Sequence, residues 1–317
     1  MGVLPAWVRP GAPLLAAALA LGLVLDAVYP WHSGLALRLH PVHTAYVMAL
    51  RLAPRGSGRV RGVAAWLAVM ASHLGLAALM LYAAWLVSPL AWLAAASIIV
   101  KVSCPLTPLF DAVERFRRCA EVGDWGCARR YAQWLVRRNV YELGESHVAS
   151  AVLESLAESL VDGYTSPIFY YALFGPLGAL AQRIANTLDS ALGYLEPGYA
   201  EAGWLSARAD DVINYIPARL TALALVAAAA LLGLDARGAY RAWRRYAGET
   251  LSPNAGHPMA ALAGALGVWL EKPGYYTLNP EGRPPSPRDA AAAERLAAVA
   301  ALIYTVAVVS AGLAAPL

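Results

Sequence analysis

Apolar runs alternate with short polar segments along the chain, and several of these runs are long enough to be membrane helices. The clearest is 62–87, which carries only His73 as an ionisable group. A helix needs about 20 mostly apolar residues to cross the hydrocarbon core of a bilayer. We therefore expect an all-α, polytopic integral membrane bundle of about five spans with additional re-entrant or amphipathic helices. The expected spans are 14–28, 62–87, 89–110, 219–234 and 296–315.

One further apolar run, 166–181, is interrupted by Pro167, Gly175, Pro176 and Gly178. If this run crossed fully, 186–214 would lie on the side of the membrane opposite 154–162. If it did not cross while 219–234 did, the basic loop 237–245 would lie outside. Irregular backbone is tolerated at membrane depth where it lines a cavity. We therefore expect 166–181 to be the re-entrant segment.

The stretch from Glu145 to Arg219 mixes acids and amides with apolar residues at helical spacing. At about 100° per residue, His147, Glu154, Glu158 and Asp162 share one face, and the apolar residues between them share the other. Like charges at i, i+4 repel each other, so a bound cation or a group of arginines would relieve the strain. A solvated acidic face on a surface helix is the alternative interpretation of this segment alone.

Two later helical pieces repeat this pattern. One face of the first carries Arg183, Asn186, Asp189 and Ser190 and ends at Gly193, which leaves room for a ligand or another backbone. In the second piece Asp210 and Asn214 are i, i+4, with Asp211 beside them. Three successive acid–amide faces predict one shared polar cavity at the cytosolic side of the membrane.

The composition excludes a typical soluble domain and supports a membrane protein. Apolar residues make up 59% and charged residues 15% of the chain, and the mean hydropathy is +0.49. The net charge of +4 is concentrated in arginine-rich segments such as 111–138, which fits loops facing an anionic leaflet. For that segment, a lipid anchor and a substrate-binding role both remain open. Cys104, Cys119 and Cys127 match no zinc or disulfide spacing, so we expect free thiols or small apolar residues.

Four stretches carry a resemblance to a known family. They are ESLAESLVDGYTSPIFYYALFGPLGAL, NTLDSALGY, GWLSARADDVINYIPARLTAL and SPNAGHPMAALAGALGV. Together they resemble the CbiB/CobD cobalamin-biosynthesis family, the adenosylcobinamide-phosphate (cobinamide) synthases. The resemblance covers most of the chain, from the LVLDAVYPWH region near the N-terminus to the SPNAG region, and it is most specific between Glu154 and Arg219.

The resemblance implies an ATP-dependent, Mg²⁺-requiring amide ligase of cobalamin biosynthesis in the cell membrane. Such an enzyme joins (R)-1-amino-2-propanol, or its O-phosphate, to a propionate carboxylate of adenosylcobyric acid, a corrinoid. We expect one multi-pass membrane domain over 1–317, with its active site on the cytoplasmic side. Its parts are the first three membrane helices (11–110), the basic segment (111–145), the polar-motif region (146–258) and the C-terminal helices (259–317). The lipid bilayer is an expected partner and nucleic acid is not. Whether the chain forms a homo-oligomer or joins other membrane proteins of the pathway is left open.

The residues suit such chemistry. Magnesium prefers hard oxygen ligands from one or two carboxylates plus phosphates, and an acid can take the proton of the attacking amine. The expected catalytic residues are Glu154, Glu158, Asp162, Asp189, Asp210 and Asp211, of which Glu154, Glu158, Asp162 and Asp189 are the expected metal ligands. The expected substrate-binding residues are Arg138, Arg183, Asn186, Ser190, Tyr194, Trp204, Asn214, Arg219, Ser252, Asn254 and Gly256. For Asn254–Gly256, a backbone cradle for phosphate and a plain turn with a helix cap are both open.

The chain departs from the family pattern at several positions. The family often has Gly-Arg-Asp-Thr where this chain has Arg137-Arg138-Asn139-Val140, and Trp where it has His257. All of the expected acids are present, so we expect an active enzyme. Two other classes remain as alternatives, an ion-coupled membrane transporter and a catalytically silent membrane homologue.

Overall fold

The computed structural model describes residues 4–193 and 198–314 and divides the chain into two compact units. Unit 1 comprises Met1–Pro105, Ser166–Ile213 and Val308–Leu317. Unit 2 comprises Leu106–Thr165 and Asn214–Ala307. Each unit is therefore assembled from segments that are distant in sequence. The single membrane domain expected from the sequence stays a prediction.

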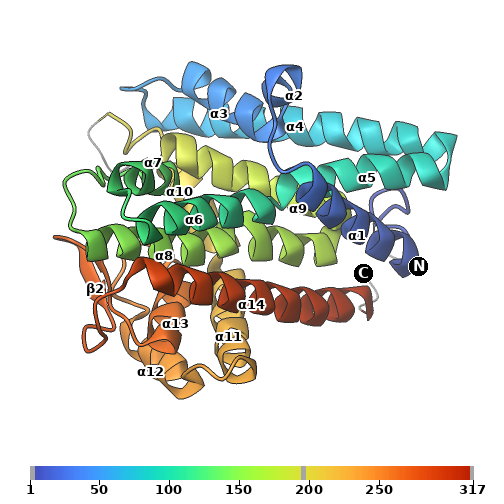
Figure 1. The fold of residues 1–317 in the computed structure, drawn as a ribbon. Helices are drawn as coiled ribbons and strands as arrows, with labels where there is room; N and C mark the ends of the chain where they lie inside the picture. The colour runs from blue at the N-terminus through green and yellow to red at the C-terminus, as the bar shows by residue number, and fades with distance from the viewer. Residues whose placement is uncertain (1–3, 194–197, 315–317) are drawn as a thin grey trace. The chain divides into compact units, whose positions relative to one another are not determined.

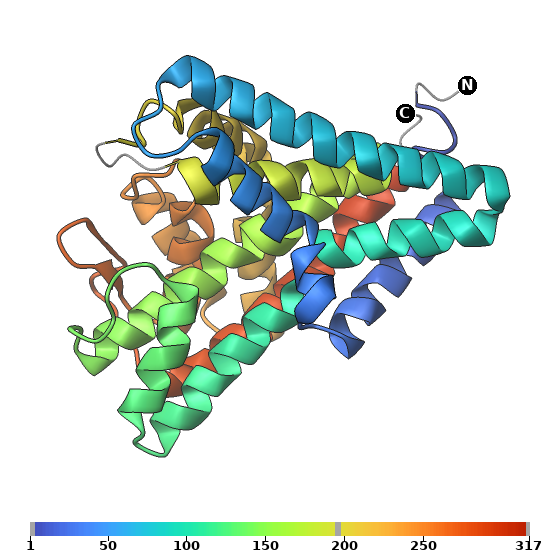
Figure 2. The ribbon, with the colours of Figure 1, turned by 90° about the horizontal axis from the view of Figure 1, so that it is seen from above.

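Unit 1 is built from helices (Figures 1 and 2). They are α1 (Ala12–Val28), α2 (Gly34–Arg38), α3 (Pro41–Leu52), α4 (Arg59–Val87), α5 (Pro89–Ser103), α9 (Ser166–Leu192) and α10 (Trp204–Ile213). The helix α9 packs against α3, α4, α5 and α10. In Figure 2, α4 and α5 diverge from the turn at Ser88, where the Ser88 hydroxyl caps α5 by accepting from the Ala91 amide at 3.1 Å.

The Pro/Gly-interrupted segment is broken in the structure, as the sequence predicts. Gly175 has a φ of 67° inside α9, and a side chain there would collide with the Val8 carbonyl. Pro176 follows and cannot donate a hydrogen bond to the carbonyl of Ala172, four residues earlier. Arg9 supplies a donor instead, from Nη2 to Ala172 O at 3.3 Å and to Gly312 O at 2.5 Å. The break is confirmed, and the re-entrant path stays a prediction.

Unit 2 contains the remaining helices and the only strands in the described part of the chain. Its elements are α6 (Leu106–Glu121), α7 (Trp125–Leu135), α8 (Glu145–Leu160), the π-helical turn η1 (Val161–Thr165), α11 (Tyr215–Leu231), α12 (Ala236–Tyr246), α13 (Gly256–Leu266), β1 (Leu270–Lys272), β2 (Tyr276–Leu278) and most of α14 (Pro287–Ala314). The two strands pair antiparallel in a short hairpin. The helix α8 packs against α6, α7, α13 and β1. The all-α expectation holds except for this hairpin, which the sequence reading missed.

Three helical stretches in the described residues are long and apolar enough to cross a membrane. They are Arg59–Val87 (α4), Pro89–Glu121 (α5 together with α6) and Pro287–Leu313 (in α14). The helices α10 and α11 would make a fourth span if they are counted together, and α1 is a shorter apolar helix. This indicates a membrane protein. By length and composition, the described residues contain three candidate spans, or four with the α10–α11 pair, and the count of about five stays a prediction.

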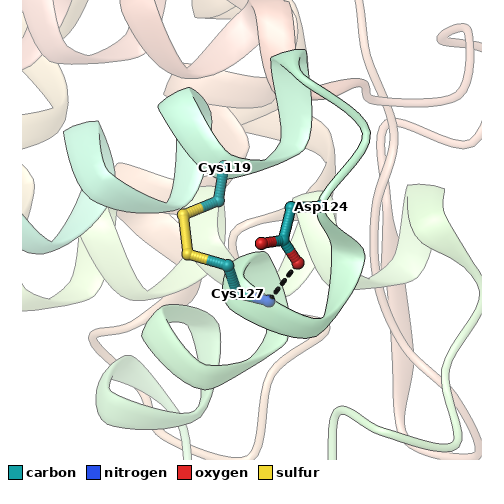
Figure 3. The surroundings of a disulfide bond; sticks show 3 residues. All are labelled: Cys119, Asp124 and Cys127. Carbon is teal, nitrogen blue, oxygen red and sulfur yellow. Dashed lines mark hydrogen bonds between the residues drawn. A yellow bond between two sulfur atoms is a disulfide. The ribbon is translucent and has the colours of Figure 1, made fainter.

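Two of the three cysteines form a disulfide, which corrects the expectation of free thiols. Cys119 at the end of α6 is bonded to Cys127 in the first turn of α7, with Cα atoms 5.6 Å apart (Figure 3). Asp124 caps α7 between them, because its Oδ1 accepts from the Cys127 amide at 2.9 Å. Spacing alone did not reveal the pair because the tight α6–α7 turn brings it together. Cys104 is a free, buried thiol.

The basic segment expected at 111–138 is partly neutralised by its own acids. Arg115 bonds Asp111 at 2.8 Å, and Arg117 bonds Glu114 and Glu121, each at 2.7 Å. These are i, i+3 and i, i+4 pairs on the surface of α6. Part of the positive charge counted from the sequence is therefore already balanced within the helix.

Candidate active site

The acidic stripe predicted from periodicity lies on α8 and the π turn that follows it (Figure 1). Val152, Leu153 and Leu156 are buried, as the apolar face requires. The expectation that all the carboxylates point away from the buried side is wrong at Glu154, which is only 3% exposed. Glu158 is exposed and Asp162 is partly exposed. The stripe is thus divided between a buried part and a part that a ligand can reach.

Glu154 accepts four hydrogen bonds from the protein. Arg138 donates to both carboxylate oxygens, to Oε1 at 2.7 Å and to Oε2 at 3.1 Å. The Ser150 hydroxyl donates to Oε1 at 2.7 Å, and the Tyr276 hydroxyl donates to Oε2 at 2.7 Å. A carboxylate offers about four lone pairs. All of those of Glu154 are therefore engaged.

The electrostatics of this group follow from burial and from the Glu154 charge. Burial lowers the pKa of Arg138, but the hydrogen bond and attraction of Glu154 outweigh it and leave the pKa above its ordinary value. Burial raises the pKa of Tyr276, and the charges of Glu154 and Glu158 raise it further. Both side chains therefore keep their protons, so they stay hydrogen-bond donors to Glu154.

Asp162 lies inside the π turn and is bonded to the next acid–amide segment. Asn214, at the start of α11, donates from Nδ2 to Asp162 Oδ1 at 3.1 Å. A buried hydrogen bond holds the turn in place: the Oγ1 atoms of Thr165 and Thr221 are 2.6 Å apart, and both residues are 0% exposed. π-Helical turns occur often at functional sites. Within unit 2, the structure thus brings together two of the predicted site residues from separate helices.

Arg219 and Asn254 are also brought together in unit 2. Arg219 Nη1 donates to Asn254 Oδ1 at 3.3 Å, and its guanidinium lies 3.4 Å from the centre of the Tyr215 ring. Asn254 is 5% exposed. Arg219, an expected substrate-binding residue, is therefore held in place by an aromatic face and an amide.

The turn before α13 favours the plain cap over the backbone phosphate cradle. The Ser252 hydroxyl accepts from the Asn254 amide at 3.2 Å and from the Ala255 amide at 3.4 Å. The Thr250 hydroxyl accepts from the Gly256 amide at 3.1 Å. The donors that a phosphate would need are already used within the turn.

His257, where the family often has Trp, is held neutral in this region. Its Nδ1 accepts from the Trp243 indole at 2.8 Å. Burial, and then the charge of Arg219, lower the pKa of His257 to about 4. The imidazole therefore serves as a hydrogen-bond acceptor at neutral pH.

Unit 1 holds the other predicted acids and amides. Asn186 on α9 is 8% exposed and donates from Nδ2 to Asp210 Oδ1 on α10 at 3.1 Å. Gly193 is needed because a side chain there would collide with the Asp189 carboxylate. The Asp189 carboxylate therefore occupies part of the space beside Gly193, and a ligand there stays a prediction. The helix α9 also carries Arg183 and Ser190.

The remaining predicted residues of unit 1 lie at its surface or outside the described residues. Asp211 bonds the exposed Arg208 at 3.4 Å, and Trp204 is 42% exposed with the Arg59 guanidinium 4.9 Å from its ring. Tyr194 lies outside the described residues. Among the predicted site residues that the structure describes, Asp162 pairs with Asn214 in unit 2 and Asn186 pairs with Asp210 in unit 1. One pocket shared by all of these residues stays a prediction.

Sequence reasoning missed Ser150, Glu271 and Tyr276, which complete the network around α8. Ser150 is one turn before Glu154 and could have been found from that spacing. Tyr276 is separated from Glu154 by 122 positions, and no local pattern connects them. The metal and catalytic roles assigned from sequence remain predictions.

Comparison with known proteins gives the family. The model of the CobD/Cbib protein family matches residues 19–304 of the chain. The chain belongs to this family. It is 50% identical over 297 residues to the probable cobalamin biosynthesis protein CobD of Aeropyrum pernix, covering 94% of this chain and 93% of that protein.

More distant relatives of the CobD family agree. The chain is 48% identical over 152 residues to the probable cobalamin biosynthesis protein CobD of Methanothermobacter thermautotrophicus, covering 48% of this chain and 51% of that protein. It is 39% identical over 206 residues to the cobalamin biosynthesis protein CobD of Dehalococcoides mccartyi, covering 64% and 67%. No solved structure matches. These relatives support a role in cobalamin biosynthesis.

Proposed function

We propose that this CobD-family chain is an ATP-dependent amide ligase, an adenosylcobinamide-phosphate synthase of the cell membrane. It joins 1-amino-2-propanol, or its O-phosphate, to a propionate carboxylate of adenosylcobyric acid. The observation that carries the proposal is a pair of accessible acids, Glu158 in the last turn of α8 and Asp162 in the π turn that follows. Asp162 is tied through Asn214 to the helix that bears Arg219.

The donor set suits Mg²⁺ together with a nucleotide. Within the described residues, no three His, Cys, Asp or Glu side chains form a group that could hold a metal ion. Mg²⁺ does not need one, because it is commonly held by one or two carboxylates plus phosphate oxygens and waters. Glu158 and Asp162 would supply the carboxylates. The ion would neutralise phosphate charge during transfer.

The chemistry requires an activated acid and a deprotonated amine. In the proposed reaction, a substrate carboxylate oxygen attacks the γ-phosphorus of ATP, ADP leaves, and an acyl phosphate forms. The amine then attacks the acyl carbon, phosphate leaves, and a carboxylate of the site acts as the base that takes the amine proton. Arg219, fixed by Tyr215 and Asn254, is suited to bind phosphate oxygens. We place this site on the cytoplasmic side, where ATP is available.

The test uses the full chain, purified in detergent, with adenosylcobyric acid and MgATP. Each amine, free and phosphorylated, is supplied separately, and the amide product and ADP are measured by mass spectrometry. Amide formation that needs both ATP and amine supports the proposal. ATP-independent amide formation, or no amide alongside substrate-driven ion flux in liposomes, contradicts it.

Matched variants connect activity to the site. Glu158→Gln and Asp189→Asn, made separately, test the acids of unit 2 and unit 1. Glu249→Gln changes an exposed glutamate of unit 2 outside the stripe and serves as the control. If both site variants turn over substrate as the control does, neither the stripe on α8 nor Asp189 on α9 belongs to the active site.

A further inference from the structure

The β1–β2 hairpin is too short to be stable by itself. Its strands are three residues each, with Leu270 opposite Leu278 and Lys272 opposite Tyr276. An isolated two-stranded hairpin is marginally stable at best in water. Other parts of unit 2 must therefore hold it in place.

One face of α8 supplies these contacts. His147 Nε2 donates to the Glu271 carboxylate at 3.0 Å, and the Ser150 hydroxyl accepts from the Glu271 amide at 2.7 Å. Glu154 accepts from the Tyr276 hydroxyl at 2.7 Å. These three α8 residues are spaced i, i+3 and i+7, which places them on one helix face. Each of them bonds the hairpin, so the N-terminal half of the stripe is a binding face for β1 and β2 (Figure 1).

Glu154 has no lone pair to spare for an ion. Its four acceptor positions are taken by Arg138, Ser150 and Tyr276, and the side chain is buried. A metal ion bound there would displace at least one donor and lie against the Arg138 guanidinium, a like charge. The geometry of Glu154 is that of a closed structural network.

Tyr276 links this network to the accessible half of the stripe. Its hydroxyl is bonded to Glu154, and Glu158 follows Glu154 by one helical turn on the same face of α8. The phenol is therefore held at the turn of α8 that precedes Glu158. Moving the hairpin would change the surroundings of Glu158.

We propose that Glu154 and Tyr276 are positioning residues that fix the β1–β2 hairpin on α8, one helical turn before Glu158, and that Glu154 is not a metal ligand. This inference rests on the proposed function for the role of Glu158 but not for the hairpin contacts. It reassigns Glu154 from the metal set predicted from sequence. It also adds Tyr276, which no sequence pattern singled out.

The first arm of the test does not need activity. Hydrogen–deuterium exchange is measured over residues 270–278 in the full chain for Tyr276→Phe, Glu154→Gln and the control Tyr275→Phe. Tyr275 is the neighbouring tyrosine and is 63% exposed. We expect exchange about tenfold faster in Tyr276→Phe, the factor for losing one hydrogen bond to a charged group. The control should match the unmodified chain. Equal exchange in Tyr276→Phe and in the control would overturn the hairpin role.

The second arm separates positioning from metal binding through turnover. We expect Tyr276→Phe to lower kcat about tenfold, with the half-saturating Mg²⁺ concentration unchanged within about twofold. Glu158→Gln should raise that Mg²⁺ concentration about tenfold or more. An equal rise in Glu154→Gln would show that Glu154 is a ligand.

Two outcomes keep the proposals apart. If Glu154→Gln does not fold, Tyr276→Phe still decides the hairpin role, and unchanged exchange and kcat in that variant overturn the inference. If the unmodified chain forms no amide, the proposed function fails, and the exchange arm still gives a result on the hairpin.

Discussion

The two halves of the polar face of α8 differ in how far the rest of unit 2 buries their carboxylates. Glu154 and Glu158 are the same residue type, one helical turn apart. Glu154 is 3% exposed and engaged by Arg138, Ser150 and Tyr276, whereas Glu158 is exposed. Periodicity places both on one face, but only partners from distant segments distinguish a buried structural acid from an accessible one. A carboxylate stripe on a helix should therefore be divided by its partners before roles are assigned.

The largest expected effect comes from removing the partner of the buried acid. Arg138→Ala leaves Glu154 buried without its counter-charge, and we expect a loss of about 3–5 kcal/mol in the free energy of unfolding. Chemical unfolding in detergent measures this loss. Arg137→Ala, at the exposed neighbouring position, should change it by less than about 0.5 kcal/mol. Equal stabilities of the two variants would show that the Glu154 network contributes little.

The accessible half should respond in activity and not in stability. Glu158→Gln keeps the size of an exposed side chain, so we expect unfolding to be unchanged within about 0.5 kcal/mol. Under the proposed function, turnover should fall about 100-fold, the lower range for losing an acid–base group. Amide formation and unfolding are measured on the same preparation. A stability loss like that of Arg138→Ala would erase the contrast between the two acids.

A half-buried histidine elsewhere in unit 2 makes stability depend on pH. The pKa of His257 is lowered from 6.5 to about 4 by burial and by Arg219, so the unfolded chain binds more protons between these values. The stability from neutral His257 is present above about pH 6.5 and is lost as the pH falls toward 4. Discounted for partial exposure, we expect this loss to be about 1–2 kcal/mol.

The measurement for His257 is thermal unfolding across this pH range. His257→Asn keeps an acceptor near Trp243 but does not titrate, so its acid loss should be smaller by the same amount. If both proteins lose stability in parallel, His257 does not contribute to acid sensitivity.

A helix cap far from the stripe gives the smallest expected effect and sets the scale for the others. Asp124 caps α7 through the Cys127 amide. Asp124→Ala should cost about 1 kcal/mol of stability without changing amide formation. Thermal unfolding and turnover check both parts. A turnover loss as large as that of Glu158→Gln would mean that activity is sensitive to packing outside the stripe. The turnover of the stripe variants would then not identify the active site.

The helices could be predicted from sequence because their signals are local. The run 62–87 lies within α4, and the acids of 154–162 fall on α8 and the turn after it. The break at Gly175 and Pro176 could also be predicted from the sequence, because both residues disfavour a continuous helix. Features that depend on contacts between distant segments could not be predicted from the sequence. Strands of three residues show no alternating pattern, and Tyr276 meets Glu154 only after folding.

The candidate site was predictable in residue type but not in arrangement. The pairs Asp162–Asn214 and Asn186–Asp210 join residues that the sequence had already selected. The burial of Glu154 was not predictable because Arg138 and the hairpin cover it. The Cys119–Cys127 bond was missed for a similar reason, since the α6–α7 turn determines the separation of the two thiols.

The guanidinium that bonds the broken part of α9 affects how the N-terminus can be altered. Arg9 comes before the first helix, where truncations and affinity tags are usually made, yet it donates to the Ala172 carbonyl that Pro176 leaves without a backbone donor. Trimming the first ten residues would leave that carbonyl without its donor, at a cost of about 1–3 kcal/mol if it stays buried. An N-terminal truncation of this protein should therefore stop before Arg9.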